Sequence, residues 1–283
     1  MRVFTLLIFL ALGQASEAEV KNNHLENLAV LIPSCDKYAE AWPGFFKLLD
    51  KYWPQLDNKI YLIGGKEKYE RENLFNISIL NEKSWSDNVL QALENIEEDY
   101  VMIFLEDYYI TKPVDQEKLV RFFEIMKQEG AANLVLAPSG EYLKKHPDES
   151  GVAYMNLKQL YRTSLQAVIW KKEILKKLLK SGESPWEFEL VGTLRTHEMN
   201  ESFMIVTKDM PIPYFGVIRK GHWWRDIDKL AAKEGLNLKR KLPTEGFFRE
   251  KYIELMGWIS VHINKPVKKL FGLENKTLAP GWF

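Results

Sequence analysis

The chain has 283 residues, enough for one large domain or two small ones with a full hydrophobic core. Its 46% hydrophobic and 28% charged residues are typical of globular proteins, which excludes a largely disordered chain, a collagen-like repeat and a multi-pass membrane protein. Lys plus Arg and Asp plus Glu are both 39, so the composition gives no reason to expect nucleic-acid binding.

The first residues are typical of a secretory signal. An apolar run, Val3 to Leu12, follows Met1-Arg2, and Ser16-Glu17-Ala18 then places small residues where a signal peptidase cleaves. The apolar run is about half the ~20 residues that span a bilayer. We expect residues 1–18 to be a signal peptide or a short apolar leader. A signal would make the protein exported or membrane-associated, and a leader without that role would leave it cytoplasmic.

From residue 27 onward, apolar runs alternate with amphipathic segments. Continuous apolar runs bounded by turn residues predict strands, and apolar residues at helical spacing predict helices. In the first half we expect strands at 28–34, 59–65, 77–80, 100–110 and 133–139, and helices at 37–53, 86–96 (capped by Ser84 or Ser86) and 117–128.

The second half continues this alternation. We expect a surface loop at 140–160, a strand at 164–170, helices at 171–182 and 186–196, a strand at 202–208 and an edge strand running into a loop at 215–224. This order predicts a single α/β domain over residues 27–229, with a mostly parallel, Rossmann-like sheet flanked by helices. We expect residues 230–283 to form a basic, aromatic helical extension, which would either contact an anionic membrane peripherally or pack back on the domain.

The acidic pair Glu106-Asp107 ends the strongest predicted strand. Ligands of open α/β sheets bind outside the carboxyl ends of the strands, so we expect both carboxylates at the ligand site. Their hard oxygens suit Mg²⁺ or Mn²⁺, ions that also bind diphosphate oxygens. Tyr108 and Tyr109 follow directly and suit a sugar phosphate. The alternative is that the two acids only end a strand at the solvent.

Several segments together carry a resemblance to a known family. They are LAVLIPSCDKY, KIYLIGG, SWSDNVLQALENI before a strand ending in FLEDYY, SLQAVIW and SPWEFE, in this order. Over about residues 27 to 225 the chain resembles nucleotide-sugar glycosyltransferases of the GT-A fold, of the kind that build bacterial surface polysaccharide. The resemblance implies a GT-A-like fold, a nucleotide-sugar donor, and a glycan or lipid-linked acceptor.

The resemblance also implies a metal and a donor site. The last Asp of an Asp-x-Asp motif binds the metal in that family, and Asp107 is its counterpart here, although this chain reads Glu106-Asp107-Tyr108. Glu106 would contact sugar hydroxyls or water, and Lys220 or Arg219 would neutralise the diphosphate. The remaining donor-binding candidates are Pro33, Ser34, Asp36, Gly64, Gly65, Trp85, Ser86 and Asn88.

A second acidic cluster, Glu187-Phe188-Glu189, opens the helix at 186–196. A helix N-terminus stabilises negative charge, and inverting glycosyl transfer needs one base near the acceptor hydroxyl. The resemblance assigns that role to Glu189 or, failing it, Glu187, with an N-terminal dipole effect as the alternative. Trp186 would stack on the acceptor sugar and Gln166, on its strand, would hydrogen-bond it. The resemblance further makes His222 a second metal ligand.

Motifs of other chemistries are absent from the sequence. It has no Gly-x-Gly-x-x-Gly, no phosphate-binding Gly-Lys-Ser/Thr loop, no Gly-x-Ser-x-Gly and no His-Glu-x-x-His. The single cysteine, Cys35, excludes an intrachain disulfide. Two alternatives stay open: an exported, non-catalytic carbohydrate-binding protein on the same fold, and a glycoside hydrolase that uses two carboxylates.

Overall fold

The computed structural model describes residues 24–138, 142–145, 151–246 and 251. The predicted leader at residues 1–18 and most of the predicted C-terminal extension lie outside these ranges. Within the described ranges, no helix is both long enough and apolar enough to span a bilayer.

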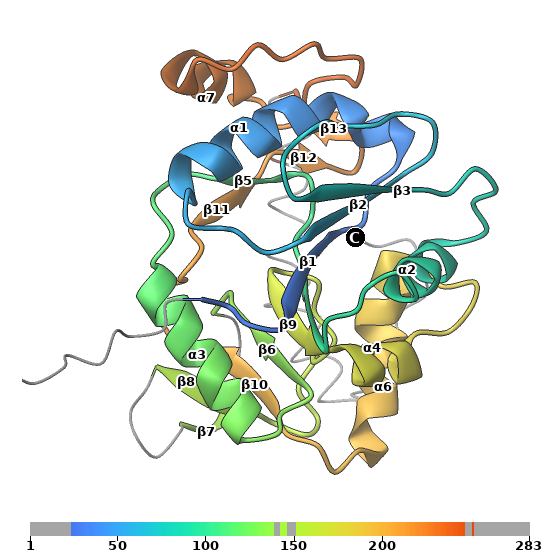
Figure 1. The fold of residues 1–283 in the computed structure, drawn as a ribbon, viewed down its shortest axis with the longest axis vertical. Coiled ribbons are helices and arrows are strands. Elements are labelled where there is room, and N and C mark those ends of the chain that lie inside the picture. Colours follow the sequence, from blue (N-terminus) through green and yellow to red (C-terminus); the bar gives the residue numbers. More distant parts are fainter. Residues whose placement is uncertain (1–23, 139–141, 146–150, 247–250, 252–283) are drawn as a thin grey trace, which may run out of the picture.

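Nine strands form one central sheet in the order β3-β2-β1-β4-β9-β6-β10-β8-β7 (Figure 1). Seven of them run in one direction, because only β9 and β8 are antiparallel to both of their neighbours. The predicted mostly parallel sheet is therefore confirmed. The strands are β1 (Leu28–Ile32), β2 (Ile60–Gly64), β3 (Leu74–Ser78), β4 (Tyr100–Ile103), β6 (Asn133–Val135), β7 (Tyr142–Lys145), β8 (Val152–Met155), β9 (Val168–Lys171) and β10 (Phe203–Val206).

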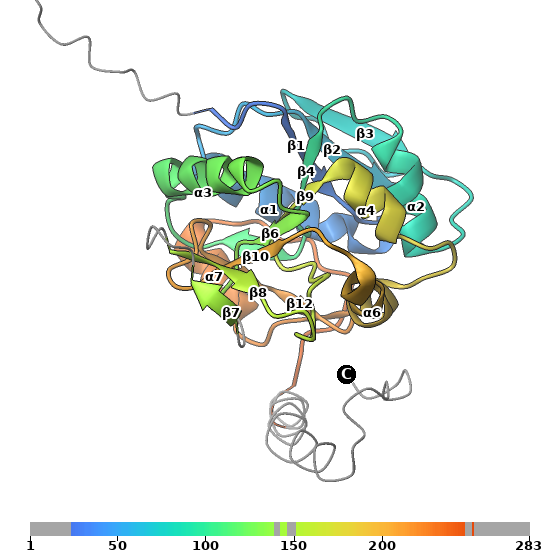
Figure 2. The same ribbon diagram turned by 90° about the horizontal axis from the view of Figure 1, so that it is seen from below.

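Helices cover both faces of this sheet (Figures 1 and 2). One face carries α1 (Trp42–Tyr52), preceded by the 3-10 turn η1 (Asp36–Ala41), and α3 (Gln116–Gln128); the other carries α2 (Trp85–Leu93) and α4 (Lys172–Leu178). Within β1, Val30 and Ile32 are buried against the first face, and Ala29 and Leu31 against the second. Burial on both sides explains why this strand is a continuous apolar run.

Smaller elements complete the domain beside the sheet. The helix predicted at 186–196 is confirmed, with a π turn inside it. These elements are β5 (Tyr108–Ile110), α5 (Pro185–Glu187), the π turn (Phe188–Gly192), α6 (Thr193–Arg195), a 3-10 turn (Thr196–Glu198), β11 (Tyr214–Gly216), β12 (Ile218–Arg219), β13 (His222–Trp223) and α7 (Ile227–Glu234).

Two sequence predictions were wrong in this region. The strand predicted at 100–110 is two strands, since β4 ends at Ile103 and β5 pairs with β11 in a separate two-stranded sheet. The loop predicted at 140–160 contains β7 and β8, which extend the central sheet beyond β10. Both strands are short antiparallel additions at one sheet edge, where no long apolar run is needed.

The described part of the C-terminal extension packs against the domain. Four leucines after the start of α7 are partly buried against the core: Leu230, Leu236, Leu238 and Leu242. The backbone N–H of Trp223 donates to Pro243 O at 2.8 Å, which attaches the segment to β13. Residues 230–246 thus pack as an arm on the domain, and residues 247–250 and 252–283 of the extension lie outside the described ranges.

Candidate functional site

The site forms where the carboxyl ends of β1, β2 and β4 meet at one sheet edge. These strands are parallel neighbours, so the chain that follows each emerges on the same side. β9 is antiparallel, and its Val168 pairs with Ile103 of β4. The residues just before Val168 therefore lie beside the turn that carries Glu106 and Asp107.

The acidic pair in this turn is largely removed from water. Glu106 is only 7% exposed, and Asp107 is half-buried. Burial raises the pKa of Glu106, the neighbouring Asp107 carboxylate raises it further, and the Ser34 hydroxyl opposes this by hydrogen-bonding the carboxylate. Burial also raises the pKa of Asp107. A bound cation would stabilise the ionised form of two adjacent carboxyl groups held in this way.

A stacked tyrosine pair lies next to Asp107. The rings of Tyr108 and Tyr214 are 4.3 Å apart at an angle of 20°, and the backbone N–H of Val217 donates to Asp107 O at 2.8 Å. Burial raises the pKa of Tyr214, and the charges of Asp107 and Glu189 add to this effect. The pair therefore lies within electrostatic reach of both acids. Tyr109, in contrast, is buried and donates to Ala41 O at 2.9 Å, so it belongs to the core.

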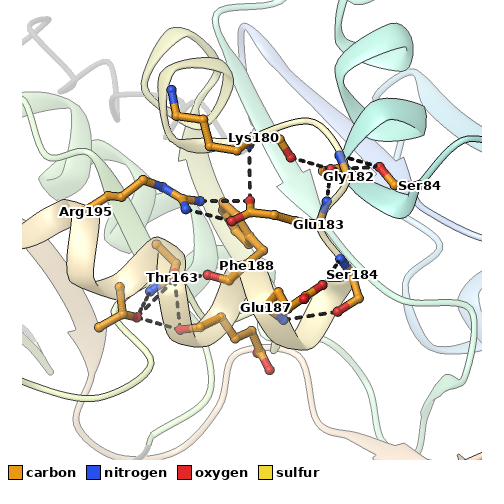
Figure 3. Close-up of polar contacts among 12 residues, drawn as sticks. Ser84, Thr163, Lys180, Gly182, Glu183, Ser184, Glu187, Phe188 and Arg195 are labelled. Atoms are coloured by element: carbon orange, nitrogen blue, oxygen red, sulfur yellow. Dashed lines mark hydrogen bonds and ion pairs between the residues drawn. The ribbon is translucent and has the colours of Figure 1, made fainter. Parts of the chain in front are cut away.

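Glu189 is held in place from two sides. Its Oε1 accepts from the Leu165 backbone N–H at 2.8 Å, just before β9 begins. Burial raises its pKa, while the bonds from Leu165 and from the Ser164 side chain lower it. Behind it, the Thr163 hydroxyl contacts Phe188 O at 2.8 Å and Glu189 O at 3.1 Å (Figure 3). These carbonyls belong to the π turn.

Glu187 has a different environment from Glu189. Its Oε2 accepts from the Ser184 backbone N–H at 2.8 Å, and the Ser184 hydroxyl accepts from the Glu187 N–H at 3.3 Å (Figure 3). These two bonds form a capping box at the start of α5. The Ser184 backbone bond lowers the pKa of Glu187, which is exposed. Glu187 thus has a structural contact that explains its position.

A cleft of about 340 Å³ opens at the ends of β1, β2 and β3, and the charge of Glu106 acts on Cys35 in its lining. Its lining combines cations with apolar and acidic groups: Cys35, Asp36, Lys37, Gly65, Lys66, Ile79, Leu80 and Glu82. Asp36 and Gly65 were predicted to bind donor, and both line this cleft. The Asp36 carboxylate is already engaged, because it accepts from the backbone N–H groups of residues 65, 66 and 67. The Lys66 bond contributes most to its lowered pKa.

The predicted glycines and Lys220 also lie around this cleft. A Cβ on Gly64 would lie 3.1 Å from the Trp42 ring, a tight contact, so packing favours glycine here. Lys220 and Gly221 both have positive φ, 47° and 73°, and form the tight turn between β12 and β13. A Cβ on Gly221 would lie 3.5 Å from Lys37 Nζ, which places the Lys220 turn beside the cleft.

Pro33 and Ser34 follow β1 directly. Pro33 is buried, and Ser34 Oγ accepts from Trp42 Nε1 at 2.9 Å. Since the Ser34 hydroxyl also contacts Glu106, it connects α1 to the acidic pair. Ser34 thus helps to position the acidic pair.

Of the predicted residues on α2, Trp85 contacts the helix that carries Glu189, and Ser86 contacts the segment just before it. Ser84 is the N-cap, one of the two residues predicted for it. Ser86 is fully buried and its hydroxyl donates to Lys180 O at 2.6 Å. Trp85 packs on Phe188, with ring centroids 5.6 Å apart, and Asn88 is half-buried on the same helix. Figure 3 shows Ser84 and Gly182 linked in this network.

The three remaining candidates are Gln166, Trp186 and His222. Gln166 is exposed and precedes β9 in a turn, so its predicted position on a strand was wrong; the left-handed Ala167, at φ 40°, delays the strand. Trp186 is 62% exposed on α5. His222 Nδ1 lies 3.1 Å from Lys220 O, and no hydrogen bond or ion pair joins His222 to Asp107. In the described ranges, no three His, Cys, Asp or Glu side chains gather to hold a metal.

The structure adds residues that the sequence did not predict. Lys66 and Lys37 place two cations in the cleft. Lys66 directly follows the glycine pair at a strand end, so the same strand-end rule that selected Gly64 and Gly65 could have found it. Tyr214 and Thr163 carry no such signal, because their partners lie far along the chain.

Comparisons with known proteins give only distant structural similarity. No family model matches the sequence, and no curated protein matches it. S. aureus TarS is 14% identical with a TM-score of 0.42, covering 76% of this chain and 40% of its own length. A mannosyltransferase from Pyrobaculum calidifontis, solved with GDP-Man and Mn²⁺, is 11% identical with a TM-score of 0.44. The match covers 69% of this chain and 58% of the mannosyltransferase. A cytidylyltransferase from Thermus thermophilus is 11% identical with a TM-score of 0.44. The match covers 73% of this chain and 98% of the cytidylyltransferase. These values are too low to assign an activity.

Proposed function

We propose that the protein is a glycosyltransferase that moves a sugar from a nucleoside diphosphate sugar to an acceptor hydroxyl. One observation carries the proposal: the acidic pair of buried Glu106 and half-buried Asp107, and a third, half-buried carboxyl group, Glu189, all act electrostatically on the stacked tyrosines at the carboxyl edge of an α/β sheet. Ligands of such sheets bind at that edge.

The cleft at the ends of β1, β2 and β3 supports a nucleotide donor. Lys37 and Lys66 supply positive charge where a diphosphate would lie, and Ile79 and Leu80 supply apolar surface for a base. The turn at Lys220 and Gly221 lies next to Lys37, which lines this cleft. A protein with zero net charge needs this local arrangement to hold an anion.

The acidic pair fits a divalent cation. Mg²⁺ and Mn²⁺ are commonly held by one or two carboxylates together with substrate phosphates, so a cluster of three protein ligands is not required. Burial raises the pKa of both carboxyl groups, which makes a cation a favourable replacement for their protons. Asp107 would hold the metal and Glu106 would support it. When bound, Mn²⁺ or Mg²⁺ would neutralise the diphosphate leaving group.

In this proposal Glu189 is the base. Its carboxylate takes the proton of the acceptor hydroxyl as that oxygen forms a bond to the anomeric carbon. On the opposite face, the bond from this carbon to the diphosphate oxygen breaks, and its electron pair leaves with the diphosphate. The configuration therefore inverts. The Leu165 N–H fixes one carboxylate oxygen, and a pKa raised by burial suits a general base.

A donor screen tests this proposal. We expect hydrolysis of at least one nucleotide sugar, stimulated by Mn²⁺, and calorimetric binding of the nucleotide that depends on the ion. Asp107→Asn should abolish both, whereas Asp57→Asn, an exposed aspartate before β2, should abolish neither. Full Mn²⁺-stimulated turnover in Asp107→Asn would overturn the metal assignment. Glycan binding without nucleotide binding would instead indicate a non-catalytic carbohydrate-binding protein.

A further inference from the structure

Strand β11 ends in a glycine that neither the backbone nor the packing requires. Most glycines in the described ranges have a positive φ or a Cβ position that neighbouring atoms crowd. Gly216 has neither, since its φ lies outside the left-handed region and the nearest atom to an added Cβ would be 3.9 Å away. A strand glycine lowers stability, because it loses more backbone entropy on folding and has no side chain to pack. The fold alone would therefore accept alanine at this position.

The absent side chain of Gly216 would face Asp107 and Tyr108. Gly216 pairs with Tyr108 where β11 lies beside β5 (Figure 1), and the N–H of the next residue, Val217, donates to Asp107 O at 2.8 Å. A Cβ on Gly216 would lie 4.0 Å from Asp107 Oδ2 and 3.9 Å from Cε1 of the Tyr108 ring. These are ordinary contact distances, so a methyl group fits there, but it would occupy the room beside the carboxylate.

A glycine of this kind indicates a ligand. Glycine inside a strand often marks a place where a ligand or another backbone approaches closely. No backbone atom lies within 4 Å of the Cβ position of Gly216 in the described ranges, where its listed neighbours are side-chain atoms of Asp107 and Tyr108. The room that Gly216 leaves is therefore available to a bound molecule next to the proposed metal ligand, Asp107.

The groups around this room suit a sugar. Burial raises the pKa of the Tyr108 and Tyr214 phenols, and the charges of Asp107 and Glu189 add to this effect. Within the residues that the structure describes, neither phenol hydroxyl makes a hydrogen bond, so both can bond to a ligand. A sugar offers hydroxyl groups to a carboxylate and C–H groups to an aromatic ring, whereas Mg²⁺ or Mn²⁺ alone prefers oxygen ligands.

We propose, building on the function proposed above, that Gly216 limits the size of the sugar in the donor site. The sugar of the nucleoside diphosphate sugar lies against the Asp107 carboxylate and the edge of the Tyr108 ring, in the room that a side chain at residue 216 would fill. Gly216 is thus a specificity-determining residue that acts by having no side chain.

Calorimetry of the full chain with Mn²⁺ tests this proposal. Each nucleotide sugar from the donor screen is compared with its own nucleoside diphosphate, beginning with UDP-glucose against UDP and GDP-mannose against GDP. Gly216→Ala should weaken the nucleotide sugar by about tenfold or more, and Gly216→Val more strongly, because each added carbon takes room from the sugar. Affinity for the nucleoside diphosphate, which has no sugar at this position, should stay within about twofold.

Two controls separate this effect from damage to the fold. Gly246→Ala and Gly246→Val change a glycine whose Cβ position has nothing within 4 Å, and both variants should bind nucleotide sugars as the natural protein does. Urea unfolding should give Gly216→Ala a midpoint equal to or above that of the natural protein, since alanine is favoured over glycine in a strand. A lower midpoint would mean that packing requires the glycine, and this result would overturn the proposal.

The ligand comparison has two further outcomes that would overturn it. Unchanged affinity for nucleotide sugars in Gly216→Ala would show that no sugar lies at residue 216. Equal weakening of the nucleotide sugar, the nucleoside diphosphate and Mn²⁺ itself would assign the room to the metal.

Failure of this proposal differs from failure of the proposed function. If the natural protein turns over a nucleotide sugar and Gly216→Ala binds it equally well, only the role of Gly216 is wrong. If the natural protein neither binds nor turns over any nucleotide sugar, the proposed function is wrong, and the donor sugar assigned to residue 216 is wrong with it. The donor screen on the natural protein therefore distinguishes the two failures.

Discussion

Asp36 and Gly65 approach so closely that residue 65 has no room for a side chain. The Gly65 N–H donates to Asp36 Oδ1 at 2.8 Å, and a Cβ at this position would lie 2.7 Å from Asp36 Oδ2. The glycine that follows β2 is thus required by the chain itself, because it lets one carboxylate bind the backbone of the loop that lines the cleft.

Gly65→Ala should disturb this loop. The added methyl group must displace Asp36 or the backbone, and we expect a loss of about 1 to 3 kcal/mol in the free energy of unfolding, together with weaker nucleotide binding. Urea unfolding and calorimetry would measure the two effects. Gly246→Ala is the matched control, since nothing lies within 4 Å of its Cβ. Equal behaviour of the two variants would show that the loop tolerates a side chain at residue 65.

The acidic pair predicts how stability depends on pH. Burial raises the pKa of Glu106 and Asp107 above their ordinary values of 4.5 and 3.8. Between the ordinary and the raised values, the folded protein binds more protons than the unfolded chain. The free energy of unfolding therefore falls as pH rises through this range. Glu106→Gln should be more stable than the natural protein above neutral pH, by about 1 to 3 kcal/mol.

Urea unfolding across the pH range, without divalent ions, checks this prediction. Glu72→Gln, at an exposed position, should follow the natural protein. Mn²⁺ should offset the fall in stability of the natural protein at high pH, because an ion that binds only the folded state stabilises it. A Glu106→Gln profile that parallels the natural one at every pH would contradict the buried charge.

The apolar pattern predicted the layers of the fold but not the end of β4. Phe104 and Tyr109 are both buried, so the apolar run continues across the turn that carries the acids. Periodicity within one segment does not reveal which strand each half will pair with. β5 finds its partner in β11, around Tyr214, and a contact so distant in sequence has no local signal.

The separation of Glu187 from Glu189 was partly predictable. Ser184 and Glu187 are spaced as a capping box, a pattern that can be read from sequence alone. This pattern would have predicted that Glu187 caps α5. The environment of Glu189 was not predictable in this way, because its carboxylate is fixed by Leu165, 24 residues earlier in the chain.

The two glutamates should differ in their effect on catalysis. Glu189→Gln should lower kcat for transfer by about 10² to 10⁴-fold through loss of the general base. Glu187→Gln should leave kcat unchanged, since glutamine also serves in a capping box. Steady-state kinetics with a saturating donor would measure both. Loss of activity in Glu187→Gln alone would move the role of base to Glu187.

The pH dependence of transfer tests the environment of Glu189. A base must be deprotonated, so activity should rise with pH through the Glu189 pKa, which burial holds above its ordinary 4.5. The Ser164 hydrogen bond lowers this pKa, and Ser164→Ala should therefore move the acid limb to higher pH. An unmoved or lowered acid limb in Ser164→Ala would show that another group controls it.

Thr163 should act as a positioning residue for Glu189. Thr163→Val keeps the shape of the side chain but leaves the buried Phe188 O of the π turn without its hydroxyl, while Glu189 O keeps its bond from the Thr193 hydroxyl. We expect a loss of about 1 to 3 kcal/mol in the free energy of unfolding and a lower kcat with an unchanged KM for donor. Thr163→Ser should restore both.

Thr207→Val, which removes a hydroxyl bonded to Gly151 O, is the matched control and should keep its kcat. A Thr163→Val protein that is less stable but keeps the natural kcat and acid limb would reduce Thr163 to a purely structural role, because a displaced Glu189 carboxylate must change one of the two.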